Sequence, residues 1–239
     1  MNDPDGKAML QGQEIVKGDT HQKLSGAGFV LGAVLVVIGS LLLPRAADLS
    51  DVQAMQRAYG EQALLLQVCA LLLTFGFWAV MIGTSGFYQS ITVDGAAWAR
   101  LGFYFHLVGV ALWTIGMSLD ISYPAAIVNW LEAPAAEKDL AYSVVAVLSP
   151  VGFGRGTFPL NVIVNWLAFT FFGIGMIRGR VHPQWLGWWE VLLGLAGLTI
   201  GIIMTFTGRE ALINVFVFFM FLNILWWLTC GVWLLRKAW

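Results

Sequence analysis

The sequence predicts an all-α, polytopic transmembrane helix bundle with six spans and both termini in the cytoplasm. Two observations support this prediction: 59% of the 239 residues are hydrophobic while only 11% are charged, and the apolar residues fall into six long runs. A soluble domain has about 25% charged residues, so this chain could not cover its own surface in water. The net charge of −1 also excludes the basic field that binds nucleic acid.

Each predicted span is a run nearly free of charge. About 20 apolar residues cross roughly 30 Å of hydrocarbon as a helix, which satisfies its own backbone hydrogen bonds. The six spans are expected at residues 24–44, 62–84, 101–119, 158–177, 183–207 and 211–235. They form one domain, residues 24–239, after a polar cytoplasmic tail, residues 1–23, that alone is expected to be disordered. The long polar tail favours a retained anchor over a cleaved signal peptide.

Residues 120–157 are expected to form one long loop on the outer side, with interfacial or re-entrant pieces. Its apolar stretch 121–131 is too short to span, and a second stretch ends in proline and glycines. Four residues of the loop can share one helical face, which predicts a short helix at the interface or against a partner: Ala141, Val144, Val145 and Leu148. Lysines and arginines gather on the side of the termini, which fits a bacterial inner (plasma) membrane.

Glycines mark the faces by which helices pack in lipid, because they allow backbones to approach closely. Two spans repeat glycine every seven residues, which keeps the glycines on one helical face. These helix-packing candidates are Gly102, Gly109 and Gly116 in the third span, and Gly187, Gly194, Gly197 and Gly201 in the fifth.

Two ionisable residues fall inside the predicted spans, and such residues are functional hypotheses by default. His106 and Glu190 are expected at similar depth, each on its glycine face, so we expect the two side chains to meet. A pair of this kind could transfer a proton or bind a metal or a polar ligand. The structural alternatives are one buried hydrogen bond that fixes helix register, or Glu190 reaching the headgroups. Glu190 is the one charge expected well inside a span.

Asn161 and Asn165 lie four residues apart, on one face of the fourth span. Asparagines between membrane helices usually hold helices together, and selecting a substrate is the alternative. The sequence shows no metal-ligand spacing, no pair of intramembrane histidines for haem and no phosphate-binding loop. We therefore expect no catalytic residue, metal or cofactor, although bound lipid is expected.

Several segments resemble a bacterial family of six-helix integral membrane proteins. They are Leu31-Gly, Ile38-Gly39 and Pro44-Arg45 followed by Asp48-Leu-Ser-Asp51, then Ala133-Pro-Ala-Ala-Glu-Lys138, and His182-Pro-Gln-Trp-Leu-Gly-Trp188. The resemblance implies the six-helix architecture and no activity. Similar proteins often have a histidine around the second span, where this chain has Gln67 and Cys69, so the resemblance transfers no site.

The first functional hypothesis is a non-enzymatic accessory or structural subunit of a larger membrane protein complex, because ionisable groups are scarce and glycine faces are many. The second is a small transporter or membrane sensor, with His106 and Glu190 as proton or ligand groups and Asn161 and Asn165 as polar lining. The third is a membrane enzyme acting on a lipid or quinone. The expected partners are the lipid bilayer and other proteins.

Overall fold

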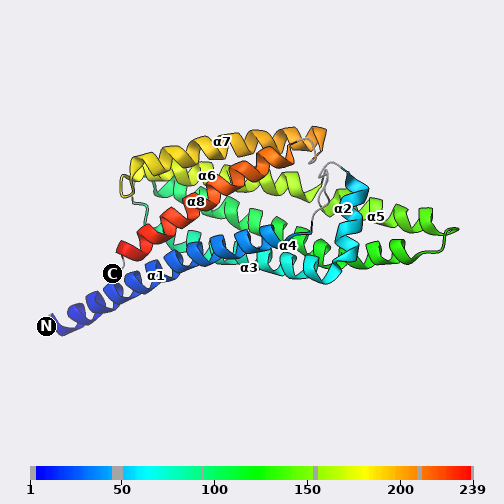
Figure 1. Cartoon of the computed structure of the whole chain (residues 1–239). Coiled ribbons are helices and arrows are strands. Elements are labelled where there is room, and N and C mark those ends of the chain that lie inside the picture. The colour runs from blue at the N-terminus through cyan, green and yellow to red at the C-terminus, as the bar shows by residue number, and fades with distance from the viewer. Residues whose placement is uncertain (1–3, 45–50, 93, 153–155, 209–211, 238–239) are drawn as a thin grey trace.

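The computed structural model describes residues 4–44, 51–92, 94–152, 156–208 and 212–237, which are helical apart from short connections (Figure 1). Within them lie eight helices: α1 Pro4–Leu42, α2 Val52–Glu61, α3 Ala63–Gln89, α4 Ala96–Glu132, α5 Lys138–Gly152, α6 Thr157–Gly179, α7 Gln184–Thr207 and α8 Ile213–Lys237. These residues contain no strand, so the all-α prediction is confirmed.

Six of the described helices are long and apolar enough to cross a membrane. They are Thr20–Leu42 within α1, and the whole of α3, α4, α6, α7 and α8. Each overlaps one predicted span, although residue 211, where the sixth was expected to begin, lies outside the described residues. Large apolar side chains stand exposed along these helices, such as Leu64, Phe206 and Phe218. This pattern fits a protein whose outer surface faces lipid rather than water.

The bundle is packed around aromatic side chains from several helices. The fully buried ring of Trp226 on α8 lies 6.1 Å from Phe29 of α1, 5.5 Å from Phe87 of α3 and 6.2 Å from Phe169 of α6, measured between ring centroids. Its indole nitrogen donates a 3.1 Å hydrogen bond to the carbonyl oxygen of Leu186 on α7. One side chain of the last helix therefore contacts four of the others.

Helices α1 and α3 pack through glycines that were not among the predicted packing residues. A Cβ atom added at Gly28 would lie 2.6 Å from the Ala79 carbonyl oxygen, and one at Gly32 would lie 2.7 Å from that of Gly76. The two glycines are four residues apart, which is the spacing that lets two membrane helices approach closely. The Ser25 hydroxyl adds a 3.2 Å hydrogen bond to the carbonyl oxygen of Ile82.

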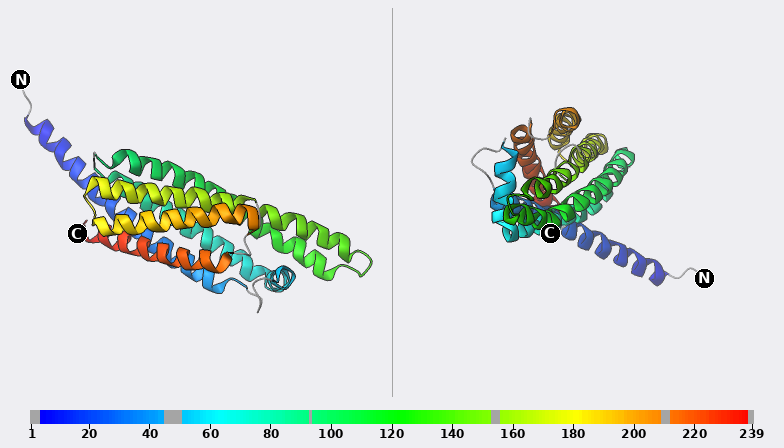
Figure 2. Two further views of the ribbon diagram at one scale, coloured as in Figure 1. Left: turned by 90° about the horizontal axis from the view of Figure 1, so that it is seen from above. Right: turned by 90° about the vertical axis from the view of Figure 1, so that its right-hand side faces the viewer.

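The segment of residues 120–157 is largely helical: the loop expected at its start is wrong, whereas the short helix expected around residues 141–148 is present as part of α5. Helix α4 continues through Pro124 to Glu132, and α5 runs back beside it to form a hairpin that extends past the other helices (Figures 1 and 2). The helix continues because its buried residues Tyr123, Ile127 and Trp130 follow helical spacing and join a small apolar cluster with α2 and α5. We call α2, residues 120–132 of α4 and α5 the arm.

The described part of the expected N-terminal tail is also helical. Helix α1 begins at Pro4 and runs without a break into the first span. Proline suits the first turn of a helix, and the membrane span supplies the nucleus from which a helix extends at low cost. Its N-terminal end projects beyond the bundle at the end opposite to the arm (Figure 2).

Candidate functional site

Three of the polar residues predicted inside the membrane come together where α4 packs against α6. The Asn165 side chain lies 2.9 Å from Nδ1 of His106 on α4, measured from its amide oxygen. The amide nitrogen of Asn161 donates a 2.6 Å hydrogen bond to the carbonyl oxygen of Gly109, and that of Asn165 donates to the carbonyl oxygen of Asn161 at 3.2 Å. His106 is completely buried, and both asparagines are nearly so. The three side chains therefore join α4 to α6.

His106 keeps one ring nitrogen without a partner. Its Nε2 atom is buried and has no hydrogen bond, while the imidazole ring lies 5.4 Å from the ring of Phe169. Because Nδ1 faces the amide oxygen of Asn165, a neutral imidazole would donate its N–H there and leave Nε2 as a free acceptor.

The predicted contact between His106 and Glu190 is absent. His106 is bonded to Asn165, and neither carboxylate oxygen of Glu190 has a hydrogen-bond partner. Helix α6 packs against both α4 and α7, so the two glycine faces meet α6 instead of each other. The sequence indicated correctly that both side chains are buried, but not which helix lies between them.

The predicted packing glycines point at α6 from both sides, with one exception. On α4, an added Cβ atom would meet the Ala168 carbonyl oxygen at Gly102 and the Asn165 side chain at Gly109. On α7, it would meet the Gly173 carbonyl oxygen at Gly187, Thr170 at Gly194, the Trp166 ring at Gly197, and Val162 with Ile163 at Gly201. A Cβ at Gly116 would meet nothing within 4 Å. Asn161, near the start of α6, bonds the Gly109 carbonyl oxygen. Gly116 is two helical turns further along α4, so it lies beyond the start of α6.

Further buried polar atoms stand without partners near the middle of the bundle. The Asn223 side chain on α8 is completely buried with both amide atoms unbonded, and the indole nitrogens of Trp113 and Trp227 are also unbonded. Both of these tryptophans contact the ring of Phe77, at 4.4 and 5.8 Å. The sequence does not distinguish these tryptophans from others, because a lone tryptophan in an apolar run has no spacing that marks it as a functional residue.

Asp120 is a second buried acidic residue, at the end of the third predicted span. It is 4% exposed and lies inside α4, which continues for twelve more residues to Glu132. The arm begins at this residue, so α4 continues where the sequence predicted a loop.

A cluster around His182 closes the bundle at the end where the termini lie. The His182 Nε2 atom is 2.8 Å from the Ser90 hydroxyl, and its ring lies 5.0 Å from that of Phe87. Lys237 donates a 3.3 Å hydrogen bond to the carbonyl oxygen of Val181. Burial, and secondarily the positive charge of Lys237, lower the pKa of His182 from 6.5 to about 4. The imidazole is therefore neutral at physiological pH.

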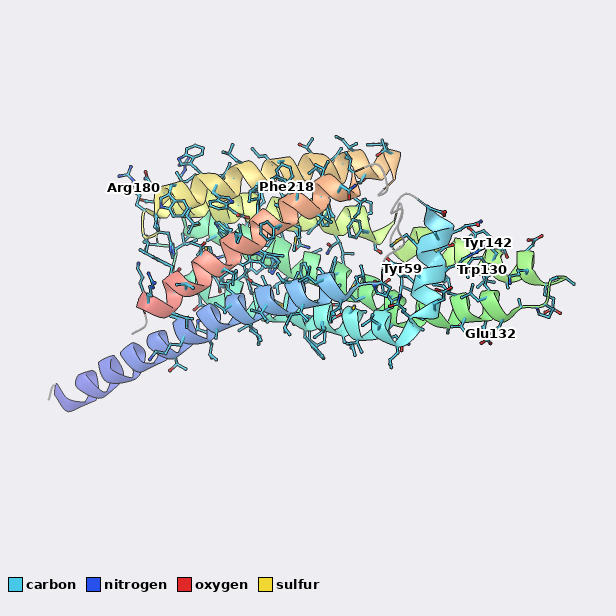
Figure 3. All side chains as sticks on the ribbon, viewed as in Figure 1. Tyr59, Trp130, Glu132, Tyr142, Arg180 and Phe218 are labelled. Carbon is cyan, nitrogen blue, oxygen red and sulfur yellow. The ribbon has the colours of Figure 1, made fainter. Side chains whose placement is uncertain are left out.

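The arm has its own small core at the opposite end. Gln56 of α2 donates a 3.1 Å hydrogen bond to the Tyr123 hydroxyl, which in turn donates to the carbonyl oxygen of Val145 at 3.4 Å. The ring of Tyr142 lies 5.0 Å from that of Trp130 between centroids, tilted by 49°, and both residues are labelled in Figure 3. These contacts hold α5 against α4 and α2.

One face of α5 is apolar and exposed. Leu140 is 72% exposed, Val144 51% and Leu148 36%, and their spacing of four residues aligns them along the helix. Val145, which was expected to share a face with Val144 and Leu148, is instead completely buried in the arm. We call Leu140, Val144 and Leu148 the α5 stripe.

No protein-family model, curated protein or solved structure matches the chain. The resemblance to a six-helix family therefore adds nothing to the site. Within the described residues, no group of three or more His, Cys, Asp or Glu side chains could hold a metal ion. Two features of the described residues bear on the function: the exposed α5 stripe and the buried polar groups without hydrogen-bond partners.

Proposed function

We propose that this integral membrane protein is an accessory subunit of a larger membrane protein complex, and that it contacts its partner through the arm. The observation that supports the proposal is the α5 stripe. Apolar side chains exposed on the spans are covered by lipid, so they need no protein partner. The stripe needs another explanation if it stands outside the bilayer.

The length of α4 supports a position outside the bilayer for the stripe. Its 37 residues extend over about 55 Å, whereas the hydrocarbon core is only about 30 Å thick. At the arm side, α3 begins at Ala63, and Gln67 near that start bonds the Ile121 carbonyl oxygen at 3.0 Å. The residues of α4 after 121, and α5 beside them, therefore pass beyond the start of α3.

The charge near the stripe favours a protein partner over a lipid surface. Glu132, Glu137 and Asp139 are exposed at the turn between α4 and α5, where Lys138 is the single basic residue. Anionic headgroups repel such an acidic turn and attract basic segments instead. We infer a partner protein whose docking surface is apolar and bordered by lysine or arginine.

The experiment extracts the protein from its native membranes in mild detergent and determines the mass of the assembly. Val144→Asp places a charge on the stripe, and Ser143→Asp places the same charge on the adjacent exposed residue, off the stripe. We expect wild type and Ser143→Asp to migrate as a complex, and Val144→Asp to be released as a smaller species. Burying an unpaired carboxylate in an apolar interface costs several kcal/mol.

Two results would contradict the proposal. One is a wild-type monomer with bound lipid and no other chain. The other is an assembly that survives Val144→Asp unchanged. A mass equal to a multiple of this chain would identify the partner as a second copy.

The proposal retains the expected orientation, with both termini in the cytoplasm of a bacterium and the arm on the outer side of the inner membrane. A transporter or sensor that uses His106 and Glu190 as one pair receives less support, because α6 packs between their helices and His106 Nε2 and both Glu190 oxygens are left without a hydrogen bond.

A further inference from the structure

The Glu190 carboxyl group is an acidic group buried in the bundle without a hydrogen-bond partner. It lies inside α7 with no exposed surface, and both of its oxygen atoms lack a hydrogen-bond partner. An ionised carboxylate placed without a partner in a low-dielectric interior costs many kcal/mol, far more than a neutral acid in the same place. Some ligand must therefore neutralise this group.

The described surroundings of Glu190 supply no positive charge. The α6 side of α7 contributes Thr170 and glycine backbone, and the α8 side contributes the buried Cys230 thiol, which is close enough to interact electrostatically with the carboxyl group. No ion pair between Glu190 and a lysine, arginine or histidine is present among the described residues. His106, the other ionisable residue predicted inside the spans, lies on α4 and is hydrogen-bonded to Asn165 of α6.

The space around Glu190 decides what kind of ligand fits. Gly187 and Gly194 lie one helical turn before and after Glu190. A Cβ atom added at Gly187 would lie 2.9 Å from the Gly173 carbonyl oxygen, and one added at Gly194 would lie 2.8 Å from the Thr170 backbone nitrogen. Helices α6 and α7 are thus in backbone contact on both sides of the carboxyl group. A metal ion with its ligands or an organic cation would force them apart, whereas a proton requires no additional space.

We propose that Glu190 is an intramembrane proton-binding site: its carboxyl group holds one proton at neutral pH while the helices are closed. Releasing that proton leaves a carboxylate that needs water, so release requires α7 to separate from α6 or α8. The exchange involves one proton and no other reactant. The site is independent of the arm, and its test does not depend on the partner.

The first experiment measures the folding equilibrium in mixed micelles from about pH 7.5 to about pH 8.5, above the range in which the unfolded chain protonates His182. The unfolded chain has an ionised Glu190 there, while the folded protein keeps the proton. The ratio of folded to unfolded protein should therefore fall about tenfold for each pH unit. Glu190→Gln, which mimics the neutral acid, should lose this slope, whereas Glu137→Gln, an exposed matched control, should keep it. Parallel profiles for wild type and Glu190→Gln would overturn the proposal.

A second experiment needs no variant, so it decides the question even if Glu190→Gln does not fold. Infrared spectra of the wild-type protein with ¹³C-labelled glutamate would reveal the carbonyl stretch of any protonated glutamate at pH 7. Glu61, Glu132 and Glu137 are exposed, whereas Glu190 is completely buried. We expect an isotope-shifted carboxylic acid band from Glu190. The absence of such a band would overturn the proposal.

Discussion

His182 shows how a single residue makes the stability of this protein depend on pH. It is 4% exposed and lies in the short connection between α6 and α7, outside the spans, with its pKa lowered to about 4 by burial and then by Lys237. The folded protein therefore favours the neutral imidazole. The unfolded chain protonates His182 near pH 6.5.

We predict that His182 makes the protein lose stability, relative to His182→Gln, as the pH falls from about 6.5 to about 4, because at this residue only the unfolded state takes up a proton in that range. The loss should approach the order of 3 kcal/mol at the acid end. His182→Gln should be less sensitive to acid over the same range. The measurement is the melting temperature in detergent, followed by tryptophan fluorescence. Equal acid sensitivity in wild type and variant would contradict the assignment.

At the residue scale, the sequence identified which polar side chains are buried but not which of them touch. His106, Glu190, Asn161 and Asn165 are all buried, as expected of polar groups in apolar runs. Periodicity gives the face and the depth of a residue on its own helix, whereas a contact also depends on which helices are neighbours. Placing α6 between α4 and α7 replaced the expected histidine–glutamate pair with a histidine–asparagine pair.

At the scale of elements, the arm depends on the Tyr123 hydroxyl, which connects α2 and α5 to α4. We predict that Tyr123→Phe increases amide hydrogen exchange in α2 and α5 by about tenfold to a hundredfold, because two hydrogen bonds are lost and each contributes about 0.5–1.5 kcal/mol. Exchange in the membrane spans should not change. Tyr142→Phe is the matched control, since its described contact is between its ring and that of Trp130, which phenylalanine retains. An arm unaffected by Tyr123→Phe would mean that apolar packing alone holds it.

The arm is also where the prediction from sequence was weakest. Its apolar stretches are shorter than a span, and they contain an aspartate and a proline, so they were assigned to a loop. Their apolar residues bury against each other and not in lipid, as Tyr59, Ile127 and Val145 do. The heptad glycines were more informative, because close backbone contact has few solutions other than glycine.

For the whole molecule, stability should depend strongly on Trp226, which contacts α1, α3, α6 and α7. We predict that Trp226→Ala lowers the free energy of unfolding by about 3–5 kcal/mol, the usual cost of removing a large aromatic side chain from a core. The control is Trp188→Ala, because Trp188 is 55% exposed on α7. The measurement is the free energy of unfolding of each variant and of the wild type in mixed micelles. Similar losses for both variants would contradict the central role of Trp226.

The position of Trp226 also bears on the order in which the protein assembles during synthesis. Its partners Phe29, Phe87, Phe169 and Leu186 belong to helices that precede α8 in the sequence and therefore leave the ribosome earlier. The earlier spans lack this shared contact until α8 enters the bilayer. Insertion of α8 is then the step that joins α1, α3, α6 and α7 around one side chain.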